Sequence, residues 1–374
     1  MIKKIQINGF KRFSEQAFEI KNLTLLSGLN GAGKSSFIQG LILTREAAKN
    51  EGSIPLDTPF GVNLGTTEDV INWYSADSNI LLEVKDSIGA THQWKLGEPE
   101  PYALYLTVQE SPSTSLPFAL QKIPRAFTYL CADRIVPKTM YQLSPCPVDD
   151  LEIGLHGENV VQLLEAVGNT DIRASGRLHP RTKEEDVTFL IYQVEMWMND
   201  IVRPIQIKAE KMGSNTISTL KFKSDGGEWV QSTNMGFGVS YVLPIIVAGL
   251  LAKAGGMLIV ENPEAHLHPA GQSNIGSFLG WLAGKGVQVI VETHSDHVLN
   301  GIRRAIADYK HISNNDACVI FFDVDGSVST LEFTEQGGIS SWPKSFFDQY
   351  QLDTIALGKL RRSKIGTGIC SELK

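Results

Sequence analysis

The sequence predicts an α/β protein built on a mainly parallel sheet with helices on both faces. From residue 236 onward, apolar strand signals at 257–260, 287–291 and 319–322 alternate with helical patterns. Near-continuous apolar strands of this kind are typical of parallel sheets buried between helices. The second observation is a glycine-rich loop at 28–33, which lies between a short apolar strand and a helical pattern.

Size and composition fit a globular protein with one large domain or two smaller ones. The chain has 374 residues, of which 42% are hydrophobic and 20% charged, and a formal net charge of −7. This acidic balance argues against wholesale coating by nucleic acid, although a local basic patch stays open. The four cysteines are scattered with no C-x-x-C pair, so we expect reduced thiols rather than disulfides or a zinc site.

The sequence also favours a cytoplasmic protein with no membrane partner. Its first seven residues alternate roughly between polar and apolar, as a first strand does, and lack the apolar core of a signal peptide. The longest apolar run, 241–252, contains Pro244. It is shorter than the roughly 20 residues that a membrane-spanning helix needs.

The elements of the first hundred residues predict strands on both sides of one helix. Residues 23–26 form a short apolar strand that leads into Gly28, and the apolar positions after Ser35 lie on one face of a helix. Residues 80–84 and 92–95 then look like strands of an antiparallel β-subdomain.

The middle of the chain, about 96–232, is expected to be an inserted and mainly helical region. Its first part, 96–120, is rich in proline and serine and predicts a loop. Further on, we expect helices and short strands over residues 158–164, 187–202, 205–207 and 220–222.

From Gly236 to about residue 325 we expect the helices of the core sheet, near 238–253 and 270–284. The remaining residues, 326–374, are expected to form a small C-terminal module followed by a basic tail, 359–364, which is most simply a solvated segment. The whole of 1–325, with its insertion, is predicted to be one nucleotide-binding domain.

Residues 28–35 fit G-x-x-x-x-G-K-[ST], the phosphate-binding P-loop. Glycines let backbone N–H groups face phosphate oxygens, and the N-terminus of the following helix adds a partial positive charge. Lys34 is expected to reach the β- and γ-phosphates, and the Ser35 hydroxyl to bind Mg²⁺. A chance glycine-rich turn is disfavoured by the flanking strand and helix. The predicted nucleotide-binding residues of this loop are Gly28, Asn30, Gly31, Ala32, Gly33, Lys34, Ser35 and Ser36.

Two other strands end in residues suited to the same site. Glu261 follows the apolar strand 257–260, where open α/β sheets place their ligands, and we expect it to bind Mg²⁺. His294 follows the strand 287–291 and is expected to contact a γ-phosphate. The alternatives are a buried capping glutamate and an N-cap cluster with Ser295.

A third segment, Asn234 to Ser240, places glycines and small polar residues just before a helix. Backbone N–H groups at such a helix start form an anion site, so Asn234, Gly236 and Gly238 are further candidates for nucleotide binding. A plain helix cap is the alternative.

The order of these motifs resembles the ATP-binding-cassette (ABC) superfamily. The likeness is to its soluble branch, which includes RecF, SMC-like heads and the ATPases of overcoming-lysogenisation-defect nucleases. It is carried most specifically by residues 261–269, ENPEAHLHP, where those relatives have an E-E-P-E-x-H-L-H-P-like run. The segment 342–349 also resembles an uncharacterised C-terminal module that accompanies such ATPases in bacteria.

The resemblance implies a homodimer with two ATP molecules sandwiched between the subunits. Each nucleotide would contact the P-loop of one subunit and the signature segment (residues 234–240) of the other. Glu261 would bind magnesium and His294 would act as the switch histidine. His266 and His268 would shape the D-loop (residues 262–268) at the dimer contact rather than hold a metal ion.

Two departures from the family pattern stand out. Tyr241 lies where the family carries a polar glutamine or arginine. Asn262 replaces the glutamate that polarises the attacking water, and an amide cannot accept a proton at neutral pH. Glu264 is a candidate substitute, so Glu261, Asn262, Glu264 and His294 form the predicted catalytic set. We therefore expect slow ATP hydrolysis.

The leading functional hypothesis is an ATP-driven switch in a DNA-linked process, above all antiviral and plasmid defence. No nuclease signature follows the ATPase segment, so an effector protein, a nuclease or toxin, is expected as partner, and DNA is a candidate ligand. The alternatives are a RecF-type repair ATPase and an ATP-sensing scaffold that does not hydrolyse. A transporter motor would need membrane partners, and a GTPase is disfavoured because an N-K-x-D motif is missing.

Overall fold

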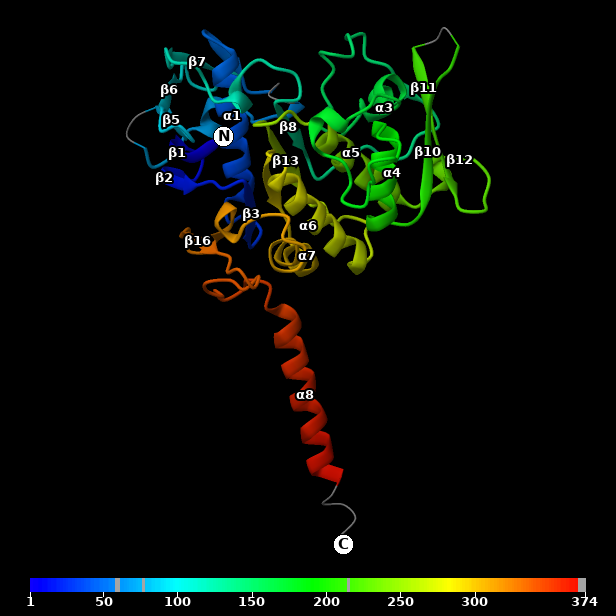
Figure 1. Cartoon of the computed structure of the whole chain (residues 1–374). Helices are drawn as coiled ribbons and strands as arrows, with labels where there is room; N and C mark the ends of the chain where they lie inside the picture. Colours follow the sequence, from blue (N-terminus) through cyan, green and yellow to red (C-terminus); the bar gives the residue numbers. More distant parts are fainter. Residues whose placement is uncertain (58–60, 76–77, 214–215, 369–374) are drawn as a thin grey trace.

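A computed structural model describes residues 1–57, 61–75, 78–213 and 216–368, the last nine as backbone only. Its described residues form three sheets, with a helix that extends away from them at the C-terminal end (Figure 1). This helix, α8 (Gln349–Gly368), includes the whole basic segment, 359–364, predicted as a tail.

The core sheet confirms the predicted α/β class. Its six strands have the order β16-β15-β3-β14-β13-β8, and all are parallel except β16. In chain order the strands are β3 (Leu23–Gly28), β8 (Phe127–Leu130), β13 (Met257–Glu261), β14 (Gln288–Glu292), β15 (Ala317–Phe322) and β16 (Val328–Glu332). The strand β14 therefore lies between the P-loop strand and the Glu261 strand.

Helices cover both faces of this sheet, as predicted. On one face the apolar side of α1 (Lys34–Lys49) packs with core residues such as Leu26 and Ile259. On the other face, residues such as Leu258 and Val289 form a core with three long helices. These helices are α5 (Phe237–Leu251), α6 (Pro269–Gly284) and α7 (Asp296–Ala307).

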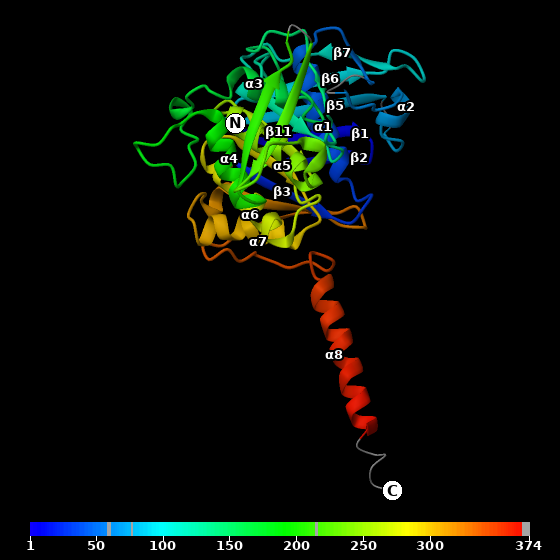
Figure 2. The ribbon, with the colours of Figure 1, turned by 90° about the vertical axis from the view of Figure 1, so that its right-hand side faces the viewer.

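The second sheet is antiparallel, in the order β2-β1-β5-β6-β7-β4, and it shares the α1 core. Helix α1 lies between it and the core sheet (Figures 1 and 2). Its elements, with one short helix, are β1 (Ile2–Phe10), β2 (Phe13–Glu19), β4 (Ser53–Pro55), α2 (Thr67–Val70), β5 (Asn79–Asp86), β6 (Thr91–Gly97) and β7 (Tyr105–Glu110).

Strand β7 corrects the prediction of a loop over residues 96–120. Leu106 is fully buried, and the register pairs Val108 with Leu96 of β6. Pairing with β6 and β4 thus makes a strand from a segment whose neighbours are rich in proline and serine, because tertiary contacts override local propensity.

The segment that we name the excursion, residues 131–236, leaves the core sheet after β8 and returns at α5. Its described residues form two α-helices and a small antiparallel sheet in which β11 pairs with β9, β10 and β12. The bounds are β9 (Tyr141–Gln142), α3 (Val160–Val167), α4 (Leu190–Ile201), β10 (Ile205–Lys211), β11 (Ile217–Ser224) and β12 (Val230–Gln231). This sheet packs against α3 and α4, as Figure 1 shows.

Candidate nucleotide-binding site

The P-loop turns back on itself between β3 and α1. Gly28 has a φ of 140° and Gly33 a φ of 113°, values that side chains disfavour and glycine adopts freely. The Lys34 Nζ donates hydrogen bonds to the carbonyls of Gly28 and Leu29 at 2.9 and 3.0 Å. Ser35, in the first turn of α1, is exposed. The loop thus presents a lysine and a hydroxyl at one helix N-terminus.

The other loop residues complete this surface. Asn30 and Gly31 are exposed, Ala32 is buried and Ser36 is partly buried. Arg12, at the start of the turn into β2, donates from Nη1 to the Gly31 carbonyl at 3.1 Å. Because Arg12 is exposed, it adds a second cation at the entrance of the P-loop.

The Glu261 carboxylate is held from the neighbouring edge strand. The Tyr129 hydroxyl, on β8, donates to Glu261 Oε1 at 2.8 Å, and the Ala132 backbone N–H donates to Oε2 at 3.2 Å. Burial and the nearby Glu261 charge raise the pKa of Tyr129, so this phenol remains a donor. Glu261 is therefore fixed in direction before any ligand binds.

Glu292 is a site residue that our sequence reasoning missed. It ends β14 in register with Glu261 on one side and Leu26 of β3 on the other. Its carboxylate lies 3.8 Å from the Lys34 Nζ, and it is 7% exposed. Burial, with the Glu261 charge as a second cause, raises the pKa of Glu292 to about 7. A carboxylate at the end of an apolar strand was the signal that could have identified it.

The segment after β14 brings His294 next to Glu264. The Glu264 carboxylate accepts one hydrogen bond from the Thr293 hydroxyl at 2.7 Å and another from the His294 backbone N–H at 3.0 Å. Partial burial and the charge of Lys34 lower the pKa of His294, so its ring is neutral at neutral pH. Ser295 caps α7, which agrees with the N-cap interpretation of this cluster.

Asn262 occupies a left-handed turn directly after Glu261. Its φ is 43°, a conformation that asparagine tolerates better than most residues. Its backbone N–H donates to the Glu292 carbonyl at 2.8 Å. Its carbonyl accepts from Arg134 Nη2 at 2.6 Å. The position where the family carries a glutamate thus holds an amide in a constrained backbone.

The signature segment contacts the D-loop. Asn234 ends a short 3-10 turn, and Gly236 is the N-cap of α5. At Gly238, an added Cβ would lie 2.7 Å from the His266 carbonyl oxygen, so only glycine fits this approach. His268 caps α6 through its Nδ1, which accepts from the Ala270 N–H at 3.3 Å. Both D-loop histidines therefore have structural contacts.

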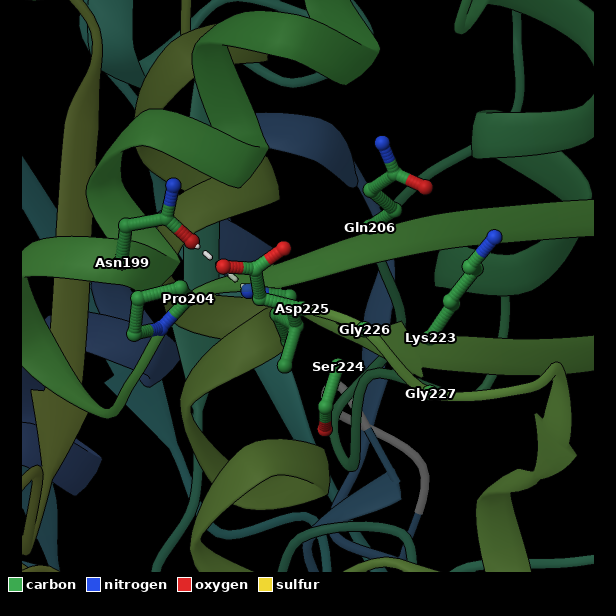
Figure 3. Close-up of a pocket in the computed structure, with 9 residues that line it drawn as sticks. Asn199, Pro204, Gln206, Lys223, Ser224, Asp225, Gly226 and Gly227 are labelled. Atoms are coloured by element: carbon green, nitrogen blue, oxygen red, sulfur yellow. Dashed lines mark hydrogen bonds between the residues drawn. The ribbon is translucent and has the colours of Figure 1, made fainter.

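A pocket drawn in Figure 3 lies apart from this site, on the excursion. It is lined by 204–206 at the start of β10, by 224–227 after β11, and by Asn199 and Lys223. Asn199 Oδ1 accepts from the backbone N–H of Ile205 at 2.8 Å, which secures the start of β10. No residue of the predicted nucleotide site is among its lining residues.

Replacing Glu292 by glutamine tests the buried charge. The pKa of Glu292 in the folded chain, about 7, exceeds its ordinary value of 4.5, so stability is lost as pH rises between these values. We expect Glu292→Gln to raise the free energy of unfolding by about 2 kcal/mol at pH 8 and to change it little at pH 4. The gain is reduced because Lys34 loses a partner charge. Denaturant unfolding of the nucleotide-free protein at both pH values measures this, and an equal effect at both would contradict it.

The fold is that of a P-loop NTPase of the ABC-ATPase head type. The P-loop, Glu261, Glu264 and His294 meet at the carboxyl ends of β3, β13 and β14, where α/β sheets bind ligands. Comparisons with known proteins agree with this class. Residues 171–300 match a family described as "AAA domain, putative AbiEii toxin, Type IV TA system". This match includes the signature segment, Glu261 and His294, but not the P-loop.

Residues 312–357 match a second family, described only as a protein of unknown function. No curated protein matches the chain. Among the residues that the structure describes, no helix is both long and apolar enough to cross a membrane.

A solved SMC head shares this fold. The Smc head domain of Pyrococcus furiosus, with an extended coiled coil and bound to the C-terminal domain of ScpA, is 11% identical, with a TM-score of 0.50 over 96% of this chain and 99% of that one. The SMC head domain from Thermotoga maritima is 12% identical, with a TM-score of 0.46 over 89% and 99% of the two chains. At this identity the Pyrococcus likeness shows the fold alone.

Proposed function

We propose that this chain binds ATP and Mg²⁺, closes as a homodimer on ATP, hydrolyses it slowly, and acts as a switch in bacterial defence with a partner effector. The proposal rests on the residues that lie at the carboxyl ends of β3, β13 and β14. Lys34 lies 3.8 Å from Glu292, the register partner of Glu261, and Asn262 follows Glu261 where the ABC pattern has a glutamate.

The donors at this edge fit a hydrated magnesium ion. Mg²⁺ prefers oxygen ligands and keeps several waters, binding through one or two carboxylates and the substrate phosphates. Ser35 Oγ and the Glu261 carboxylate would hold it, and the ion would neutralise phosphate charge. The Glu261 charge helps to raise the pKa of Glu292, a sign of excess negative charge that suits a divalent cation.

We expect slow hydrolysis because the Glu264 carboxylate, the candidate substitute base near Asn262, already accepts two hydrogen bonds. Glu264 accepts a hydrogen bond on each of its two oxygens, from Thr293 and from His294. It is therefore engaged in positioning the switch histidine and is a poor substitute base. This contact pattern also favours the second candidate, an ATP-sensing scaffold that binds nucleotide and does not hydrolyse it.

The homodimer is proposed from the signature segment. Gly236 and Phe237 are exposed at the start of α5, so their backbone N–H groups are accessible to a nucleotide held by a second subunit. The defence role is supported by the description of the matched family, which names a toxin system. A RecF-type repair ATPase remains the alternative, and a bound protein partner has a precedent in the Pyrococcus head.

Binding is tested by thermal unfolding with and without Mg²⁺ and ATP. Because a ligand that binds only the folded state stabilises it by about 2.7 kcal/mol at a hundredfold excess over Kd, wild type should melt at a clearly higher temperature with ATP. Lys34→Met should lose this shift. Lys49→Met, at the other end of α1, should keep it. A wild type that ATP does not stabilise would overturn the proposal.

The biological role is tested by native purification, mass spectrometry and ATP turnover on one sample. A stoichiometric nuclease or toxin supports defence. DNA-stimulated turnover without a partner supports the repair alternative. Stabilisation by ATP with no turnover supports the scaffold.

A further inference from the structure

The ring of Tyr241 contacts Arg134 and the D-loop residue His266. The guanidinium carbon of Arg134 is 5.3 Å from the centre of the Tyr241 ring, in a cation–π contact. The His266 ring meets Tyr241 edge-on, with centroids 4.6 Å apart. Tyr241 is 9% exposed and belongs to α5, the helix that begins with the signature segment. The unexpected tyrosine of the signature helix thus faces a buried cation.

Arg134 contacts the backbone around the site rather than a carboxylate. Its Nη1 donates to the carbonyls of Cys131 and Glu261 at 3.0 and 2.7 Å, and its Nη2 donates to the Asn262 carbonyl at 2.6 Å. Arg134 is 1% exposed. A buried guanidinium with three carbonyl acceptors is held rigidly, because each lost bond would leave a buried polar group unsatisfied.

We propose that Arg134 and Tyr241 are positioning residues that couple the signature helix to the Asn262 turn of the same subunit. The inference rests on the proposed ATPase function and deepens it, because it identifies a link between the two halves of the shared site. A nucleotide held by the second subunit would contact the start of α5. Displacement of α5 moves the Tyr241 ring, and Arg134 passes that displacement to the carbonyls of Glu261 and Asn262.

The geometry explains why the link can act on catalysis. Asn262 has a positive φ, so its backbone conformation is strained for most residues and depends on outside support. That support comes from Glu292 on its N–H and from Arg134 on its carbonyl. Loss of the Arg134 contact would let the turn relax, and the Asn262 side chain would then leave the position where it can orient water.

A double-mutant cycle on ATP turnover tests the coupling. A desolvated cation–π contact is strong enough that Tyr241→Leu and Arg134→Lys should each lower kcat by about tenfold, with KM for ATP within about twofold. If the two residues act together, the double variant should also lose about tenfold rather than a hundredfold. Tyr241→Phe, which keeps the ring, should restore kcat to within about threefold. A double variant that loses about a hundredfold in kcat, or a Tyr241→Leu variant with wild-type kcat, would overturn the inference.

The control is a second cation–π pair, at the end of α7, that includes none of the site residues. Arg304 lies 4.8 Å from the Tyr309 ring centre, and Tyr309→Leu should leave kcat unchanged. A second readout is backbone hydrogen exchange of peptides covering 257–268 in nucleotide-free protein. We expect faster exchange there in Tyr241→Leu and Arg134→Lys, but not in Tyr309→Leu.

Backbone hydrogen exchange also distinguishes a failure of this inference from a failure of the proposed function. A wild type without ATP turnover contradicts the ATPase assignment, and the exchange result then decides the coupling alone. A wild type that turns over ATP, with additive losses and unchanged exchange in the variants, contradicts the coupling alone.

Discussion

Asn262→Glu is expected to raise the turnover number for ATP by about a hundredfold, since a positioned general base contributes roughly 10²–10⁴ in rate. Asn262 follows Glu261 at the end of β13, and a carboxylate there would accept the proton of the attacking water. The gain should fall at the lower end of this range because glutamate tolerates a φ of 43° less well than asparagine.

Asn262→Gln is the matched control for this prediction. It has the length of glutamate and the same backbone cost but carries no base, so its turnover should stay at or below the wild-type value. Steady-state phosphate release at saturating ATP measures both variants. Fast wild-type turnover that Asn262→Glu leaves unchanged would remove the argument for a slow switch.

Gly28→Ala is expected to cost about 4 kcal/mol of folding free energy and to abolish nucleotide binding. An added Cβ would lie 2.2 Å from the Phe322 carbonyl oxygen of β15, and the φ of 140° is strained for any side chain. Because Gly28 and Phe322 are register partners, β3 and β15 would have to separate at their carboxyl ends. Denaturant unfolding of the nucleotide-free protein measures the loss.

Gly31→Ala separates steric overlap from backbone strain. Gly31 also has a positive φ, 76°, but no atom lies within 4 Å of an added Cβ. Its cost should therefore be only that of the backbone conformation, about 1 kcal/mol. Equal costs at both glycines would show that the contact with β15 is not the cause.

The parts of the site encoded by local pattern were predictable from the sequence. The P-loop, the Glu261 strand and the His294 segment each combine an apolar strand with a loop of characteristic residues, so they could be identified without knowing the fold. The strand predicted at 257–260 is Met257–Glu261, and the helix predicted at 270–284 is Pro269–Gly284. The spacing of apolar residues and the capping residues at the ends set these boundaries locally.

The supporting residues were not predictable, because their partners lie far away in sequence. Tyr129 and Arg134 each hydrogen-bond to Glu261, which is more than a hundred residues away in sequence. No strand was predicted over β8. Such contacts depend on the order of strands in the sheet. Glu292 differs, since its position at the end of an apolar strand carried the same signal as Glu261.

Strand β8 has a consequence for how the site responds to heat and to mechanical load. It is one of the two edge strands of the core sheet, and among the described strands it pairs with β13 alone. Edge elements open at lower free energy than the centre of a sheet. Tyr129 on β8 and Ala132 just after it donate hydrogen bonds to the Glu261 carboxylate. Fraying of β8 would therefore release this carboxylate while β3 and β14 stay paired. The competence of the site thus depends on an edge strand of the sheet, and we expect it to be lost before the fold itself.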